Sequence, residues 1–460
     1  MKFTIKNYYF YILIFPLLLN FLYNIISQEK LTIQINIYEI ISSLFLFAFF
    51  YSVGWNFKSI FESLSITFGI ITYLLSFFIF ENFINFIFNL NTSKVFIIVN
   101  GIWIILLLIK NKNKIFTFIP IIVFAILRIF NFINIESFKV NPNIFGDVKD
   151  NFFPYIEKIN NFGFLEAILN PVMDGYPILM SYIDFIIYKI SFNTSEYIFY
   201  TPNSFLFFWL NLLLISEFNV SKKSKNLGYL IFVILILNSS WLQFLFVTSL
   251  MSEKVMGYLF LGILNPLFKK NNLREYTILV FFIFGFMYFS KQFFSILTLI
   301  SFILFLFNNQ YKHYAPFILI GAIVKQIQSI TYLRESIQDY HISQIKVSQI
   351  FLEIFNYKDL KFNNLIIIMK NLAIDKPMLY FLSVCLIIVL TNTIKQNLNL
   401  EAKFYLSLVS LNLFFIMILY VTVSKNSELE SPIRFIYSFL LFYINLFLIS
   451  IDQLNQKIKS

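Results

Sequence analysis

The chain has 460 residues, of which 59% are hydrophobic and only 13% are charged, with a net charge of +11. This charged share is about half that of a water-soluble domain, so the composition excludes a soluble globular protein and favours one surrounded by lipid. The single cysteine, Cys385, excludes a disulfide within the chain. The two histidines, His313 and His341, are too far apart in sequence to indicate a His-rich metal site.

Long apolar runs recur through the sequence and predict an all-α, polytopic transmembrane bundle of roughly fourteen spans, because a bilayer core needs about 20 apolar helical residues. Helices are expected because backbone groups in lipid must be satisfied within the segment, and no run alternates as a barrel strand does. The first run has no small-residue cleavage site after it, which predicts an uncleaved span. The predicted spans are 7–27, 33–53, 64–88, 95–109, 115–133, 197–217, 227–248, 253–268, 276–290, 293–307, 314–332, 379–395, 403–424 and 434–452.

Basic residues predict the orientation of these spans. With the spans above, every basic cluster lies on one side, which the positive-inside rule assigns to the cytoplasm. The clusters are Lys2/Lys6, Lys58, Lys110/Lys112/Lys114, Lys222/Lys223/Lys225, Lys269/Lys270/Arg274, Lys312, Lys395/Lys403 and Lys457/Lys459. Both termini are therefore predicted to be cytoplasmic, in a bacterial inner (plasma) membrane. The positive charge is first a topology signal, and no nucleic-acid partner is expected.

Three connections on the opposite, outer side divide the chain: residues 134–196, residues 333–378 and the short charged segment Ser424–Arg434. Long connections in a compact protein usually carry function. The predicted organisation is an N-terminal group of roughly five spans (1–133), an outer loop (134–196), central helices (197–332), a second outer loop (333–378) and C-terminal helices (379–460).

Two helices are predicted within the first outer loop. Residues 148–162 carry apolar side chains at helical spacing, which is typical of an amphipathic helix on a membrane surface: Phe152, Phe153, Ile156 and Ile159. Residues 176–190 form an apolar run of only about fifteen residues. A full crossing there would move the later basic clusters outside, so a re-entrant or interfacial helix is predicted.

Carboxylates near the outer side are the candidate chemical groups, because they are costly beside lipid. Asp147 and Asp150 are three residues apart and would share one face of a helix, where either could act as a general base toward a hydroxyl. The alternative is that Asp147 caps the following helix. Glu253 begins a predicted span, where it either faces substrate or complements the helix dipole.

Two outer-side cations are candidate phosphate ligands. Lys291 lies between two apolar stretches, and Arg434 lies where the last span begins. Arginine grips phosphate oxygens with two hydrogen bonds. The alternatives are that Lys291 snorkels to the surface and that Arg434 is an interfacial anchor. Asp174 and Asp184 are interpreted as structural, and no soluble-enzyme motif occurs.

The order of these features resembles the first outer loop of GT-C glycosyltransferases, polytopic enzymes that use polyprenyl-phosphate-linked sugars. Gly146-Asp147 precedes the aromatic segment Phe152–Ile156, then Gly163, and then the Tyr-Pro segment Gly175–Leu179 leads into an apolar helix ending Tyr188-Lys189. Further along, Glu253, the stretch Gly285–Leu297 with Lys291, and Ser431-Pro432-Ile433-Arg434-Phe435 are similar to later family features. The likeness covers roughly residues 140–450.

The resemblance implies an inverting transfer of sugar from a polyprenyl-phosphate donor to a glycan or lipid acceptor. Asp147 would be the base with Asp150 as alternate, Lys291 and Arg434 would hold the phosphate, and Glu253 and Tyr176 would contact substrate. The sequence departs from the family at Ile178, which replaces a proline, and at Val148, where many members have a second acid. The missing acid leaves participation of a divalent metal as an open alternative.

Two other functions fit the same topology. An envelope polysaccharide polymerase or ligase would carry its site on the second outer loop, with Arg334, Lys346, Lys358 and Lys361. A lipid-linked sugar flippase or transporter would show paired broken helices and charges near the midplane of the membrane. The sequence has neither feature, and its acids gather at one face, which favours surface chemistry.

Overall fold

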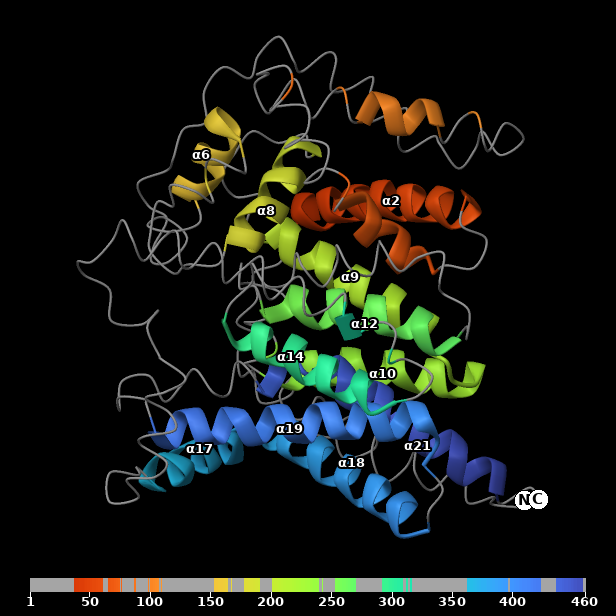
Figure 1. Cartoon of the computed structure of the whole chain (residues 1–460), viewed down its shortest axis with the longest axis vertical. Coiled ribbons are helices and arrows are strands. Elements are labelled where there is room, and N and C mark those ends of the chain that lie inside the picture. The colour runs from red at the N-terminus through yellow and green to blue at the C-terminus, as the bar shows by residue number, and fades with distance from the viewer. Residues whose placement is uncertain are drawn as a thin grey trace.

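The computed structural model describes residues 37–60, 65–74, 76, 87, 98, 100–106, 109, 153–163, 167, 178–190, 201–239, 242, 253–269, 292–308, 312, 315–316, 362–395, 398–422 and 436–457. All regular structure in these residues is helical, which confirms the predicted all-α class. Figure 1 shows most of the helices stacked side by side, with α6 and α8 together at one corner. The helices are α2 (Ile37–Ile60), α6 (Phe153–Phe162), α8 (Ile178–Ile190), α9 (Thr201–Glu217), α10 (Lys222–Asn238), α12 (Glu253–Lys269), α14 (Gln292–Leu306), α17 (Phe362–Ile374), α18 (Lys376–Ile394), α19 (Leu400–Thr422) and α21 (Leu440–Lys457).

One described helix has the length and the apolar composition of a membrane span. In the part of the chain that is described, α18 alone is both long and apolar enough to cross a membrane, and three shorter apolar helices are Leu206–Glu217, Gly257–Phe268 and Asn363–Ile374. The predicted spans 7–27, 115–133 and 276–290 lie outside the described residues. The bundle of about fourteen spans therefore stays a prediction.

Four helices differ from the predicted boundaries. α2 continues to Ile60, beyond the predicted span 33–53, and α21 continues to Lys457, beyond the predicted span 434–452. α10 was predicted at 227–248 but begins at Lys222, because Ser221 caps it by accepting a hydrogen bond from the backbone N–H of Ser224. It ends before Ser239, whose backbone is extended. α17 lies inside the predicted loop 333–378, because its apolar run was too short to be read as a span.

The helices pack around a continuous apolar core in which aromatic rings are prominent. α9 packs on α2 and α12, while α21 contacts α10, α12, α18 and α19. Rings meet edge to face across these contacts, for example Phe207 with Tyr258 at 6.3 Å and Phe381 with Phe447 at 5.8 Å between centroids. Aromatic pairs of this geometry add stability beyond their buried area.

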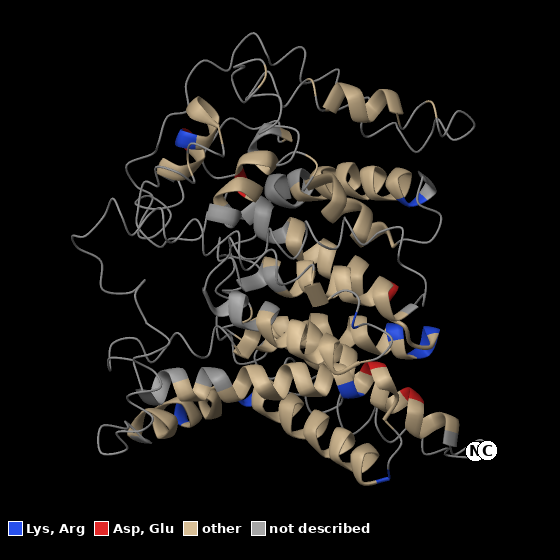
Figure 2. Ribbon diagram, viewed as in Figure 1, with Lys and Arg blue, Asp and Glu red and all other residues tan. Residues whose placement is uncertain are grey.

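Hydrogen bonds join five helices at one end of the bundle, here called the basic end: α9, α10, α18, α19 and α21. Lys225 donates to the carbonyl of Ser216 (2.8 Å), which joins the start of α10 to the end of α9. Asn392 in the last turn of α18 donates to the carbonyl of Ser450 in α21 (2.8 Å). Asn219 donates to Glu401 at the start of α19 (3.3 Å). Figure 2 shows Lys and Arg at the matching ends of α2, α10 and α18.

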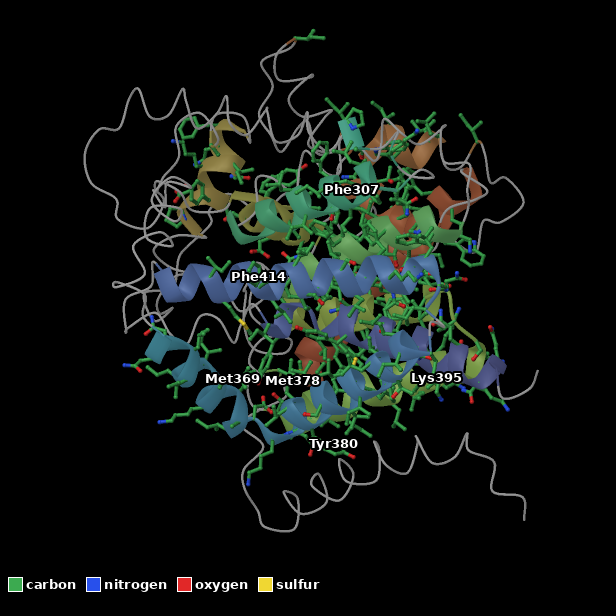
Figure 3. The ribbon with its side chains drawn as sticks, turned by 60° about the horizontal axis from the view of Figure 1, so that its bottom comes forward. Phe307, Met369, Met378, Tyr380, Lys395 and Phe414 are labelled. Carbon is green, nitrogen blue, oxygen red and sulfur yellow. The ribbon has the colours of Figure 1, made fainter. Side chains whose placement is uncertain are left out.

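This arrangement agrees with the order of basic clusters along the sequence. Lys58 lies in the last turn of α2, Lys222, Lys223 and Lys225 lie in the first turn of α10, Lys395 directly follows α18, and Lys403 lies in the first turn of α19. Figure 3 shows Lys395 at one end of α18, with Met378 and Tyr380 towards its other end. We call that other end of the bundle, where α10 stops and α18 starts, the distal end. Assigning the basic end to the cytoplasm remains a prediction.

Candidate functional site

The six residues predicted to form the site have no described side chains. Asp147, Asp150, Tyr176, Lys291 and Arg434 lie outside the described residues, and Glu253 is the first residue of α12, where only the backbone is described. At the distal end, the described residue Tyr437 follows Arg434 by three residues in the sequence.

A buried carboxylate joins three helix ends there. Asp375, which is 6% exposed, precedes α18, and its Oδ2 accepts hydrogen bonds from the hydroxyl of Ser239 after α10 and from the hydroxyl of Tyr437 (2.7 Å). Its Oδ1 accepts a longer bond from the backbone N–H of Met378 (3.4 Å). We call Ser239, Asp375 and Tyr437 the distal cluster. Because hydrogen bonds to a carboxylate are stronger than those between neutral groups, the cluster fixes these helix ends to one another.

The local sequence explains why the chain folds this way at Asp375. Asp is a preferred N-cap residue, and Pro377 follows at the start of α18, where its missing N–H costs nothing. Ser239 has a double role, because its hydroxyl also accepts from the backbone N–H of Leu242 (3.1 Å). The end of α10 and the start of α18 are thereby tied to a single carboxylate.

The starts of α12 and the last helical segment approach closely beside this cluster. A Cβ added to Gly257 would lie 2.8 Å from the carbonyl oxygen of Ser438, so only glycine permits this backbone approach. In the sequence, Glu253 precedes Gly257 by four residues and Arg434 precedes Ser438 by four. Four residues are about one helical turn. The two chain segments that lead to the predicted substrate residues are thus neighbours at their described starts.

The first outer loop contributes α6 and α8, which pack against each other. α6 covers residues 153–162 of the helix predicted at 148–162, and it has two unlike faces: Tyr155, Ile156 and Ile159 are buried, whereas Glu157 and Phe162 are exposed. Its place on a membrane surface remains a prediction. It ends at Gly163, whose φ of 93° is the left-handed conformation of a helix C-terminus. α8 matches the predicted helix at 176–190, while its re-entrant course remains a prediction.

Asp184 lies in the interior of α8 and is fully buried between Ile183 and Phe185, which are buried too. Its burial is consistent with the structural role given to it from the sequence. Asp174 lies outside the described residues.

At the basic end, carboxylates cap helices of other segments. Glu217, at the end of α9, accepts hydrogen bonds from the backbone N–H groups of Ile66 (2.6 Å) and Thr67 (3.2 Å), which begin the helical stretch after α2. Asp452 accepts from the backbone N–H (2.5 Å) and hydroxyl (2.9 Å) of Ser221 and from the hydroxyl of Ser224. An anion at a helix N-terminus is favoured by the helix dipole.

The described residues give no support to a metal site. None of their His, Cys, Asp and Glu side chains form a group of three that could hold an ion. Asp375 does not fit a metal, because its oxygens already accept hydrogen bonds from hydroxyl and N–H donors. No step below is assigned to a metal.

Sequence reasoning missed Asp375 as a residue at the distal end. A usable signal exists in Asp375-Lys376-Pro377, an N-cap followed by a helix-starting proline. This signal predicts the helix start, but not the contacts with Ser239 and Tyr437, which are 136 and 62 residues away.

Comparison of the chain with protein-family models, curated proteins and solved structures finds no match.

Proposed function

We propose that this chain is a polytopic membrane glycosyltransferase of the GT-C type. It transfers a sugar from a polyprenyl-phosphate donor to an envelope glycan or lipid acceptor at the outer face of the inner membrane. The observation that carries the proposal is the packing of α6 on α8. In the resemblance, α6 corresponds to the surface helix of the outer loop, and α8 corresponds to the apolar helix that follows the Tyr-Pro segment in the sequence.

The hydroxyl groups of α18 support the membrane part of the proposal. Ser383 donates to the carbonyl of Leu379 (2.8 Å) and Thr391 to that of Ile387 (2.7 Å), so each bonds within its own helix. Ile387 is 63% exposed between them. In lipid no water is present to satisfy a hydroxyl, and a bond to its own helix removes that cost. Figure 3 shows Phe414 of α19 and Met369 of α17 among the other exposed apolar side chains.

The proposed reaction needs a general base and cationic side chains that bind the donor phosphate. The carboxylate of Asp147, or of Asp150 as the alternate, takes the proton from the acceptor hydroxyl. The acceptor oxygen bonds to the anomeric carbon as that carbon's bond to the phosphate oxygen breaks. The polyprenyl phosphate leaves with the bonding electron pair, and the anomeric configuration is inverted. Lys291 and Arg434 stabilise the charge that develops on the phosphate, while Glu253 and Tyr176 orient the substrates.

The test is incorporation of labelled sugar into envelope glycan in a deletion strain. It is complemented by wild type, Asp147→Asn or Asp150→Asn at equal membrane abundance. We expect wild type to restore a glycan that one Asn variant does not restore, with a rate loss of about 100-fold or more. Full complementation by both Asn variants would remove this assignment of the base.

A second candidate is an envelope polysaccharide polymerase or ligase. The observation that favours it is α17, a helix inside the second outer loop that ends one residue before the distal cluster. Alanine at Arg334, Lys346, Lys358 and Lys361 separates the two functions. Loss of polymer length with single-sugar transfer intact would support the polymerase and contradict the transferase.

A further inference from the structure

The distal cluster is a polar group that the proposed reaction does not use directly. It is buried, it joins α10, α18 and the start of the last helix, and one of its members, Tyr437, follows Arg434 by three residues in sequence. The hydroxyl of Tyr437 is bonded to Asp375 at 2.7 Å. The hydrogen bond to the carboxylate therefore fixes the chain at Tyr437.

The close approach of Gly257 to the Ser438 carbonyl adds a second constraint on the same turn. Tyr437 is held by its side chain and Ser438 by backbone contact, so the first turn of the last helical segment is fixed from two sides. The same contact fixes the position of α12, which begins at Glu253, relative to this first turn.

We propose that Asp375 is a positioning residue, which acts through Tyr437 to fix the start of the last helical segment, the part of the chain that follows Arg434 in the sequence. This inference rests on the proposed function for its effect on catalysis. Asp375 does not touch substrate. A displacement of about 1 Å in a phosphate-binding group is enough to slow a reaction strongly.

The bundle offers a matched control at its other side. The hydroxyl of Tyr405 on α19 donates to Asn265 on α12 at 3.0 Å, and Tyr405 and Tyr437 are both fully buried. Tyr437→Phe and Tyr405→Phe each delete one buried interhelical hydrogen bond and keep the ring. The Tyr437 bond is to a carboxylate and the Tyr405 bond is to a neutral amide, so their effects on stability differ. A merely structural role predicts that neither substitution changes the turnover of the molecules that remain folded.

The experiment uses the full-length protein reconstituted in liposomes with a polyprenyl-phosphate sugar. We expect Tyr437→Phe to lower kcat about tenfold with little change in KM, and Tyr405→Phe to stay within about twofold of wild type. Ser239→Ala, which removes the other donor to the same oxygen, is expected to lower kcat in the same direction. Equal turnover in the two Phe variants, per folded molecule, overturns the positioning role.

A second readout does not depend on sugar transfer. Replacing Cys385 with Ala removes the only cysteine, and Ser431→Cys then reports on the segment before Tyr437 through its rate of labelling by a membrane-impermeant maleimide. We expect Tyr437→Phe, but not Tyr405→Phe, to change this rate at least threefold (about 0.7 kcal/mol). If wild type transfers no sugar, the proposed function fails, and this rate still decides whether the cluster positions the segment. An unchanged rate overturns the inference.

Discussion

The two ends of the helix bundle use acidic side chains in different ways. At the basic end, Glu217 and Asp452 each accept from the N-terminus of one other helical segment. At the distal end, the single carboxylate of Asp375 accepts from two hydroxyls and one N–H, and so connects three segments. Lys and Arg residues also gather at the basic end (Figure 2).

This difference indicates how each end tolerates change. A cap joins one acid to one helix, so its loss is local. The distal cluster shares one acid among three segments, and its loss leaves two hydroxyls buried without an acceptor. The free energy of unfolding of variants at the two ends measures this difference, by thermal or denaturant unfolding of the purified protein in a defined detergent.

The largest effect is expected at the carboxylate of the distal cluster. Asp375→Ala should lower the free energy of unfolding by about 3 kcal/mol, because the hydroxyls of Ser239 and Tyr437 remain buried. Asp375→Asn is the control, since it keeps one carbonyl oxygen and should recover more than half of the loss. An Ala variant as stable as wild type would show that the cluster contributes nothing.

The next effect concerns the close contact beside the cluster. Gly257→Ala should cost about 2 kcal/mol, because the new methyl group would press on the Ser438 carbonyl. Gly101→Ala is the matched control, since a Cβ there meets nothing within 4 Å. Gly101→Ala should be neutral or slightly stabilising, as expected for alanine in a helix. Equal effects of the two substitutions would mean that the backbone at Gly257 does not contact the Ser438 carbonyl.

A smaller effect is expected at the basic end. Glu217→Ala should cost about 1.5 kcal/mol, because it removes the acceptor for the N–H groups of Ile66 and Thr67. Glu217→Gln keeps an oxygen in place and should cost less than half as much. A Glu217→Ala loss larger than that of Asp375→Ala would reverse the comparison between the two ends.

The sequence predicts the helices better than it predicts their contacts. The boundaries of α12, α14, α18 and α19 lie within a few residues of the predicted spans, because long apolar runs between polar residues define them. α10 was misplaced, since it begins at the cap Ser221 and ends before Ser239, and the hydrogen bonds of these serines are not detected by hydropathy. α17 was missed because a short apolar helix resembles a loop by length alone.

The contacts of the distal cluster are likewise not predictable from the sequence. Asp375 is readable from the sequence as a helix cap, but its bond to Tyr437 depends on how α18 packs on α21. The approach at Gly257 depends on the register of α12 against the last helix. Such long-range contacts leave no periodic pattern in one sequence, and they decide which polar residues meet.

The smallest effect separates two kinds of serine hydroxyl. Ser383 is exposed on α18 and donates only within its own helix, so Ser383→Ala should change the free energy of unfolding by less than about 0.5 kcal/mol. Ser239→Ala should cost about 1 kcal/mol, because its hydroxyl connects α10 to Asp375. Both substitutions remove the same atom, so their ratio measures the value of bonding between helices. A Ser383→Ala loss as large as that of Ser239→Ala would show that the exposed face of α18 has a polar partner, and lipid contact there would have to be abandoned.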